Sequence, residues 1–150
     1  MKKFKEVIVH NYHQHQSSGG ALILRVMIGL TFLIHGYDKL ADIAPVIKFF
    51  GSLGLSPFQA YLVGWVELVG GALLILGLFM KPSTIALMTV MAVAVFGIPG
   101  KGSGLFWGHE YEFVLLIALL GLYVLGSGRY SLLHVYHKYR HGTPIATDAK

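Results

Sequence analysis

The chain has 150 residues, about the length of one domain. Hydrophobic residues make up 55% of it and charged residues 13%, a balance that soluble domains do not have, so the composition predicts a membrane protein. The chain contains no cysteine, which excludes disulfides, thiolate metal sites and thiol catalysis. The formal net charge is +5, but the basic residues gather mainly in the two tails, where they more often fix membrane topology than bind nucleic acid.

Four apolar stretches are long enough to cross a bilayer, which takes about 17 to 25 helical residues. They have hardly any of the polar stripe that each helix of a soluble bundle needs. We therefore expect an all-α integral membrane protein, an antiparallel four-helix bundle over residues 20–128 with cytoplasmic tails at 1–19 and 129–150. The predicted spans are residues 20–37, 57–80, 82–99 and 111–127.

Lysine and arginine near the ends of the spans predict the orientation, because cytoplasmic loops carry the excess of these residues. With the N-terminus inside, eight basic residues face the cytoplasm and three (Lys39, Lys48 and Lys101) face outside, while Arg25 lies within a span. We therefore expect both termini in the cytoplasm. The eight inner residues are Lys2, Lys3, Lys5, Lys81, Arg129, Lys138, Arg140 and Lys150.

The three stretches that connect the spans differ in composition, and each composition predicts a different local structure. The stretch "MKPST", residues 80–84, predicts a tight turn that joins the second and third spans as a hairpin. In the first outer loop, the apolar run 46–50 around Lys48 predicts a short interfacial or re-entrant segment. The second outer loop is rich in glycine and ends in aromatic residues.

The segment "GRYSLLHVYHKYRHG" after the last span predicts an amphipathic helix on the membrane surface, with apolar residues on one face and basic residues on the other. Its three histidines, His134, His137 and His141, have the spacing of metal ligands, but no carboxylate or cysteine accompanies them. The N-terminal "HNYHQH" fits no metal motif either, and a flexible tail is the simpler interpretation. We expect no metal site.

Glu67 is the residue that the apolar composition does not explain. It lies ten residues after Pro57, so it is about 15 Å below the outer surface and near the middle of the bilayer. The small residues Ala60, Gly64 and Gly71 share its helical face and allow another helix to approach closely. We therefore expect Glu67 to face protein and to have a polar partner, because an unpaired charge in hydrocarbon costs about 3 kcal/mol or more.

The first span supplies the candidate partners of Glu67. His35 is closest to it in depth, and Thr31, His35 and Lys39 form a polar ridge that rises toward the outside. Arg25 is near the inner surface, where it can extend to the headgroups or reach toward Glu67. We predict a polar site open to the outer side, with Glu67 and His35 as catalytic residues. The predicted substrate-binding residues are Arg25, Asp38, Lys39, Trp107, His109 and Glu110.

Several of these stretches together resemble the DoxX family of small four-helix bacterial membrane proteins. They are "LRVMIGLTFLIHGYDKL", "LGLSP", "WVELVGGALLILGLF" and the closing "LGSGRYSL", and the similarity covers about residues 20 to 133. The family takes its name from subunits of a thiosulfate:quinone oxidoreductase. The resemblance therefore implies a bacterial cytoplasmic-membrane protein that is associated with quinone-linked redox complexes. The cofactor stays open, with a bound quinone as the candidate, and the partners are redox subunits or further copies of the chain in a homo-oligomer.

Three functions of different class stay open from the sequence. The first is a component of a quinone-linked membrane oxidoreductase, in which Glu67 and His35 relay protons. The second is a non-catalytic scaffold or assembly subunit, in which the same polar residues only hold the helices together. The third is a small proton-coupled transporter, which is disfavoured because compact four-span exporters carry their buried acid in the first span and this chain carries it in the second.

Overall fold

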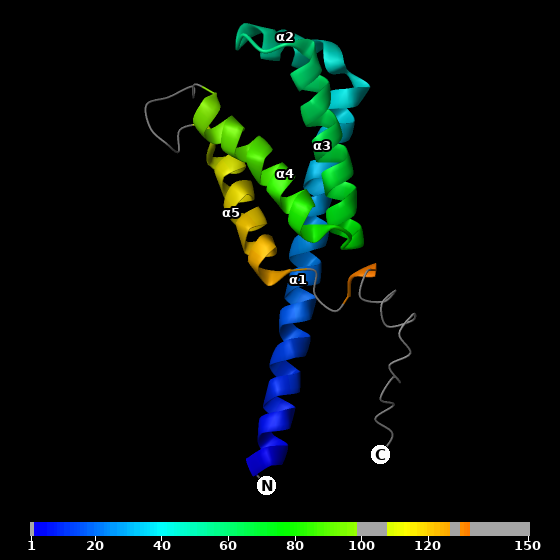
Figure 1. Cartoon of the computed structure of the whole chain (residues 1–150), viewed down its shortest axis with the longest axis vertical. Helices are drawn as coiled ribbons and strands as arrows, with labels where there is room; N and C mark the ends of the chain where they lie inside the picture. The colour runs from blue at the N-terminus through cyan, green and yellow to red at the C-terminus, as the bar shows by residue number, and fades with distance from the viewer. Residues whose placement is uncertain (1, 99–107, 127–129, 133–150) are drawn as a thin grey trace.

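The computed structural model describes residues 2–98, 108–126 and 130–132, with side chains from residue 19 onward. Trp107 and most of the predicted C-terminal amphipathic helix lie outside these residues. Within them the chain is all-helical: α1 is Lys2–Ala41, α2 is Ile43–Ser52, α3 is Pro57–Leu76, α4 is Met80–Ala92 and α5 is Glu110–Leu125 (Figure 1). A π-helical turn, η1 (Val93–Gly97), continues α4.

Three helical segments of the described part are long and apolar enough to cross a membrane, namely Gly19–Ala41, Pro57–Leu76 and Met80–Gly97. They coincide with the first three predicted spans to within a few residues. The fourth predicted span is helical where it was expected, but α5 has 16 residues and so rises only about 24 Å. The antiparallel four-span arrangement as a whole stays a prediction.

Helix α1 begins much earlier than the predicted first span. Its backbone is helical from Lys2 onward, so the expected flexible tail is a straight extension of the span beyond the other helices (Figure 1). The segment between the tail and the span, "QHQSSGG", holds weak helix formers but no proline. Serine and glycine lower helix stability by at most about 1 kcal/mol each, whereas only proline removes a hydrogen bond and clashes with the preceding turn.

The chain reverses direction between α3 and α4 three residues before the predicted turn. Gly77 ends α3 in the left-handed conformation with φ 68°, and Phe79 also has a positive φ of 47°. The expected turn sequence "MKPST" is instead the beginning of α4. Pro82 is tolerated there because the first-turn N–H groups of a helix have no partner within the helix.

Helix α2 contains the apolar run that was predicted to be interfacial. It has ten residues and no buried side chain, and it lies across the end of the molecule where α1 finishes and α3 begins (Figure 1). Ser56 and Gln59 then start α3 with a reciprocal capping box, in which the Gln59 side chain accepts a hydrogen bond from the Ser56 backbone N–H. The membrane interface as the location of α2 stays a prediction.

Glycines on both helices allow the backbones of α1 and α3 to approach each other closely. A Cβ atom on Gly71 of α3 would lie 2.6 Å from both the carbonyl oxygen of Gly29 and the backbone nitrogen of Leu33 on α1. Gly36 of α1 and Gly64 of α3 continue this seam toward α2. Small residues at such spacing are the usual means by which membrane helices bring their backbones into contact.

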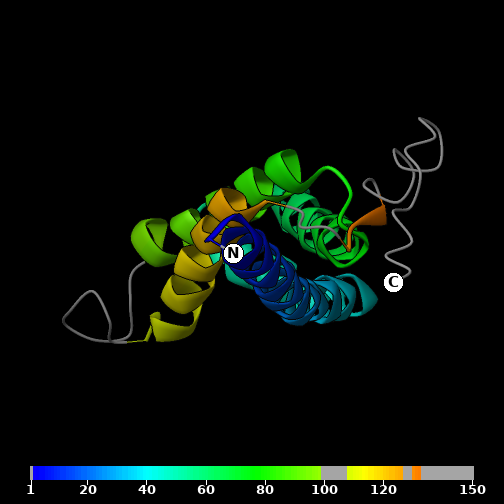
Figure 2. The same ribbon diagram turned by 90° about the horizontal axis from the view of Figure 1, so that it is seen from below.

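Helices α4 and α5 form a second pair, which packs against α3 and α1 respectively (Figures 1 and 2). Leu87 of α4 fits against Gly70 of α3, while Leu119 and Leu122 of α5 are fully buried. The core between the two pairs consists of apolar side chains from all four long helices: Ile28, Phe32, Leu74, Met80, Leu87, Met91, Leu115, Leu119 and Leu122.

Candidate functional site

Glu67 is buried inside the protein and does not face lipid. Only 1% of its surface is exposed, and its neighbours on the same face of α3, Gly64 and Gly71, are also buried against α1. The helical spacing in the sequence predicted this orientation, because Gly64 and Gly71 lie three residues before and four residues after Glu67. The glycine seam therefore places a carboxylate between two closely packed helices.

Lys39 of α1 is the partner of this carboxylate. Its ammonium group donates hydrogen bonds to both oxygens of Glu67 and forms a salt bridge with it. The Glu67 side chain is only 2% exposed, whereas 29% of the Lys39 side chain is exposed. Of the three basic residues considered from the sequence, Lys39 is therefore the one that neutralises Glu67, and the pair is open on the lysine side.

His35 lies one helical turn before Lys39 on α1 and has a different partner. Its Nε2 atom is 3.0 Å from the hydroxyl of Tyr111 at the start of α5, and the two rings meet edge-on with centroids 5.8 Å apart. Both residues are exposed. The Tyr111 hydroxyl also interacts with Thr31, and the charge of Glu67 is close enough to act on it. Polar groups from α1, α3 and α5 therefore meet at one level of the bundle.

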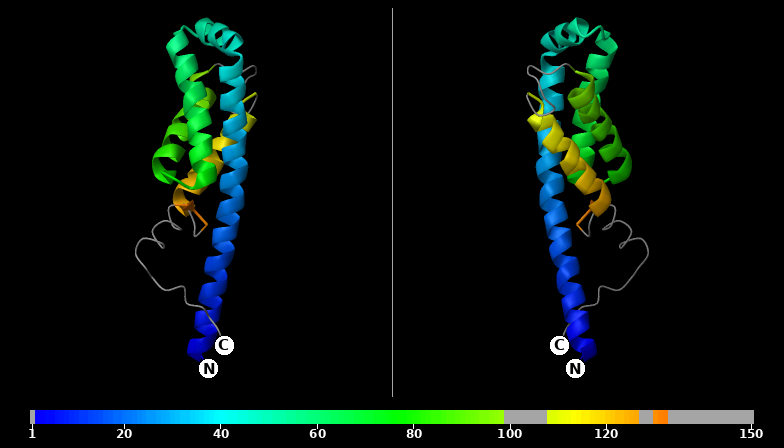
Figure 3. Two further views of the ribbon diagram at one scale, coloured as in Figure 1. Left: turned by 90° about the vertical axis from the view of Figure 1, so that its right-hand side faces the viewer. Right: turned by 90° about the vertical axis from the view of Figure 1, so that its left-hand side faces the viewer.

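Tyr111 is the residue of this cluster that sequence reasoning missed. It is 76 positions away from His35 in the chain, and their contact depends on how α5 crosses α1 (Figure 3). The available signal was a tyrosine at the outer end of the last apolar segment, which resembles the aromatic residues that anchor any span to the membrane surface.

The other predicted substrate-binding residues of the outer side form a separate group at the start of α5. The Nδ1 atom of His109 is 4.0 Å from a carboxylate oxygen of Glu112, and its Nε2 atom is buried without a partner among the described residues. Glu110 is exposed and accepts a hydrogen bond from the backbone N–H of Gly108. Asp38 is exposed on α1. Within the described part of the chain, none of these residues is bonded to Glu67, and no group of potential metal ligands occurs.

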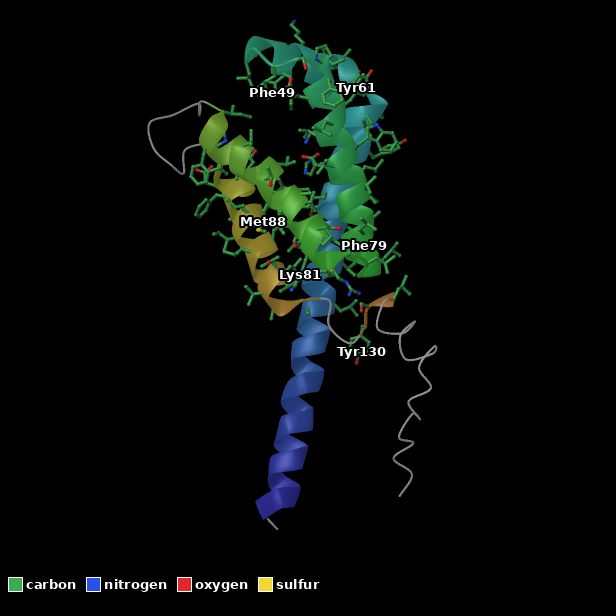
Figure 4. The ribbon with its side chains drawn as sticks, viewed as in Figure 1. Phe49, Tyr61, Phe79, Lys81, Met88 and Tyr130 are labelled. Atoms are coloured by element: carbon green, nitrogen blue, oxygen red, sulfur yellow. The ribbon has the colours of Figure 1, made fainter. Side chains whose placement is uncertain are left out.

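Arg25 lies at the opposite end of the bundle and does not reach Glu67. It is 14 residues before Lys39, about 21 Å along the helix. Only 2% of Arg25 is exposed, and its Nη2 atom donates a hydrogen bond to the Tyr130 carbonyl oxygen at 3.0 Å. Tyr130 is on the side of the molecule where Phe79 and Lys81 mark the α3–α4 turn, far from Phe49 on α2 (Figure 4).

The guanidinium of Arg25 also packs against the α3–α4 turn. A Cβ atom on Gly77 would meet it, and Ser131 is fully buried beside them. Arg25 thus joins α1, the turn after α3 and the segment after α5. The sequence predicted that Arg25 extends toward the headgroups or toward Glu67, and it is instead buried against the α3–α4 turn. The inner side of the membrane as the location of this end of the span stays a prediction.

Comparison with known proteins identifies the family of this polar helical bundle. The DoxX family model matches residues 20–100, which hold α1 from Gly20, α2, α3 and α4. The chain belongs to the DoxX family. It is 34% identical over 109 residues to the Bacillus subtilis protein named "Putative oxidoreductase CatD", covering 72% of this chain and 80% of that protein.

A second relative is an uncharacterized protein of Haemophilus influenzae, which is 34% identical over 108 residues, covering 70% of this chain and 80% of that protein. No solved structure matches the chain significantly. The family and the three apolar helices together establish a bacterial membrane protein, which confirms the membrane environment predicted from composition.

Proposed function

We propose that this DoxX protein is a component of a quinone-linked oxidoreductase system of the bacterial cytoplasmic membrane. The observation that carries the proposal is a membrane-buried carboxylate, Glu67, whose lysine partner is partly exposed and whose neighbours His35 and Tyr111 are open to the outside of the bundle. The name of the Bacillus subtilis relative, an oxidoreductase, supports the same class of function.

A quinone takes up two electrons and two protons when it is reduced. The side chains of the cluster carry protons but not electrons, so we assign the electrons to a partner subunit. Glu67 and His35 are suited to the proton side of the reaction, because a carboxylate and an imidazole both exchange protons near neutral pH when their surroundings allow it. Lys39 holds the charge of Glu67 in place and lies between it and the exposed surface.

The proposal also gives a role to the residues that were predicted to face the outer side of the membrane. We assign Asp38, His109, Glu110 and Trp107 to the mouth of the site on the outer side of the membrane, and both chain termini to the cytoplasm. Arg25 has a different role from the substrate-binding one predicted from the sequence. We assign it to holding the inner ends of the helices, because it donates a hydrogen bond to the backbone carbonyl of Tyr130.

The proposal is tested by measuring the quinone that purifies with the protein. The wild-type protein and two variants, Glu67→Gln and Thr89→Val, are purified in mild detergent, extracted with organic solvent and analysed by mass spectrometry. Thr89 is a matched control, because its hydroxyl donates only to the Ile85 carbonyl of its own helix and it lies outside the cluster. We expect bound quinone in the wild type and the control. Quinone no higher than in an unrelated membrane protein would contradict the proposal.

The Lys39–Glu67 pair also favours the second function, a scaffold in which the pair clamps α1 to α3. The same purification separates the two functions. A scaffold contains no quinone and loses stability when Glu67 is replaced by leucine. A quinone-linked protein contains quinone, and Glu67→Gln alters the proton exchange that accompanies quinone reduction even when that variant is folded.

A further inference from the structure

We propose that His35 and Tyr111 together bind the carbonyl oxygen of a lipid-soluble quinone that enters sideways from the bilayer, between α1 and α5. This inference rests on the proposed function and deepens it, because it names the residues that touch the ligand and the side from which the ligand arrives. Tyr111 thereby becomes a substrate-binding residue, which neither the sequence nor the family comparison indicated.

The His35–Tyr111 pair differs from an ordinary exposed polar group of the spans, because its hydrogen bond joins two helices. The hydroxyl of Thr89, which is also exposed, donates to a carbonyl oxygen of its own helix at 2.9 Å, so it is satisfied without any neighbour. His35 and Tyr111 instead depend on a bond between two helices. His35 lies within the first apolar span, where an exposed polar group is costly and is a candidate for a functional site, and Tyr111 meets it from the start of α5.

The side chains of His35 and Tyr111 have hydrogen-bonding positions that their mutual bond does not use. An imidazole has two ring nitrogens and a phenol has one donor and two acceptor sites. The bond between them uses one position on each, and Thr31 takes at most one more on the phenol, so a position on each side chain stays open. Tyr111 is 52% exposed, so its hydroxyl can turn toward a molecule at the surface. A neutral carbonyl oxygen accepts a hydrogen bond from either side chain without bringing a charge into the membrane.

Exposed apolar side chains flank the His35–Tyr111 pair on both helices. On α1, Ile34 is 55% exposed beside His35, and on α5, Val114 is 63% exposed one turn after Tyr111. These side chains continue the lipid-facing surfaces of the two helices, which lie against each other (Figure 3). A ligand bound here therefore places its polar atom on the pair and its ring and tail on apolar surface that lipid otherwise covers.

The His35–Tyr111 pair is accessible to a ligand, whereas the carboxylate of the Lys39–Glu67 ion pair is not. Both oxygens of Glu67 accept hydrogen bonds from Lys39, and the carboxylate itself is not accessible to a ligand. His35, one turn from Lys39 on the same helix, is accessible. The ligand thus binds at His35 and Tyr111, while the pair of Lys39 and buried Glu67, one helical turn further along α1, holds the exchangeable proton.

The experiment measures quinone affinity in lipid nanodiscs, where the ligand must arrive through the bilayer. The probes are a quinone with an isoprenoid tail and the same ring without a tail. Tyr111→Phe removes only the hydroxyl, and Tyr123→Phe makes the same change on the same helix, about three turns away at a partly exposed position. We expect Tyr111→Phe to weaken binding of the tailed quinone about threefold to tenfold, as the loss of one hydrogen bond does, and Tyr123→Phe to leave it unchanged.

The possible results distinguish failure of this inference from failure of the proposed function. Wild-type protein that binds no quinone overturns both. Wild-type protein that binds quinone equally well after Tyr111→Phe keeps the proposed function and overturns the assignment of Tyr111. Tighter binding of the tailless ring than of the tailed quinone overturns entry from the bilayer.

A second measurement does not depend on the folding of a variant. A quinone that carries a photoreactive group on its ring is illuminated with the wild-type protein in nanodiscs, and the labelled peptides are sequenced. We expect the label on residues near His35 in α1 and near Tyr111 in α5. Label confined to α4, or to the half of α1 around Arg25, would contradict the inference.

Discussion

Replacing Glu67 by leucine is the sharpest test of the ion pair between α1 and α3. The change leaves the Lys39 ammonium without its carboxylate. Removing one member of a buried pair costs about 3–5 kcal/mol. The Lys39 side chain is 29% exposed near the α2 end of α1, so it can turn part of its charge toward the surface, and we expect the lower end of this range, about 3 kcal/mol.

This loss is measured as a change in melting temperature of the purified protein in mild detergent. For a chain of this length, 3 kcal/mol corresponds to a decrease of roughly 6–12 °C. Glu67→Gln keeps an oxygen that accepts a hydrogen bond from Lys39, so we expect a smaller loss of about 1 kcal/mol. The double variant Lys39→Leu/Glu67→Leu should recover most of the stability, because it leaves no charge behind.

An exposed acid provides the control for this series. Glu110→Leu removes a carboxylate from the start of α5, where it is open to its surroundings and accepts one bond from a backbone N–H. We expect its effect to stay below about 1 kcal/mol. A melting temperature of Glu67→Leu equal to that of Glu110→Leu, or a double variant less stable than Glu67→Leu, would refute the reasoning about the pair.

Three further predictions concern the glycine packing of α1 and α3, the hydrogen bond of Arg25 and the membrane topology. Gly71→Ala should destabilise the protein, because the new Cβ meets backbone of α1 at 2.6 Å, whereas Gly121→Ala, with nothing within 4 Å, should be neutral or slightly stabilising; equal melting temperatures would contradict the glycine seam. Arg25→Met should lower stability by about 1–3 kcal/mol, since it removes the hydrogen bond from the buried guanidinium to the Tyr130 carbonyl; an unchanged melting curve would contradict the role of Arg25. Cysteines at the exposed positions Ser52 and Lys81 should react with a membrane-impermeant thiol reagent from outside and from inside respectively, and the reverse pattern would overturn the orientation.

The sequence predicted the features that depend on helical periodicity and apolar length. The orientation of Glu67 follows from residues on the same turn and the next, so Gly64 and Gly71 indicated that it faces a helix. The first three spans follow from apolar length alone. The length of α1 was underestimated, because "QHQSSGG" reads as a break although none of its residues stops a helix.

The choice of partners could not be predicted, because it depends on how helices cross and on how far a side chain extends. His35 has the depth of Glu67, yet the longer side chain of Lys39 reaches the carboxylate from one turn away. The crossing of α5 over α1 gives His35 to Tyr111 instead. Arg25 was placed by depth alone, and its bond to Tyr130 depends on where the chain runs after α5.

The buried position of Ser131 illustrates the same point. Ser131 lies in the segment that the sequence predicts to be an amphipathic helix on the membrane surface. It is fully buried next to Arg25 and Gly77, which the sequence did not indicate. A cysteine at Ser131 would therefore be a poor topology label, whereas Ser52 and Lys81 are exposed.

The central claim is that Glu67 exchanges a proton when a quinone at this site is reduced. Infrared difference spectroscopy measures this directly, by comparing the purified protein with its bound quinone before and after chemical reduction. The account predicts a carboxyl band that changes on reduction in the wild type and is absent in Glu67→Gln. Identical difference spectra of the two proteins, with equal amounts of bound quinone, would contradict it.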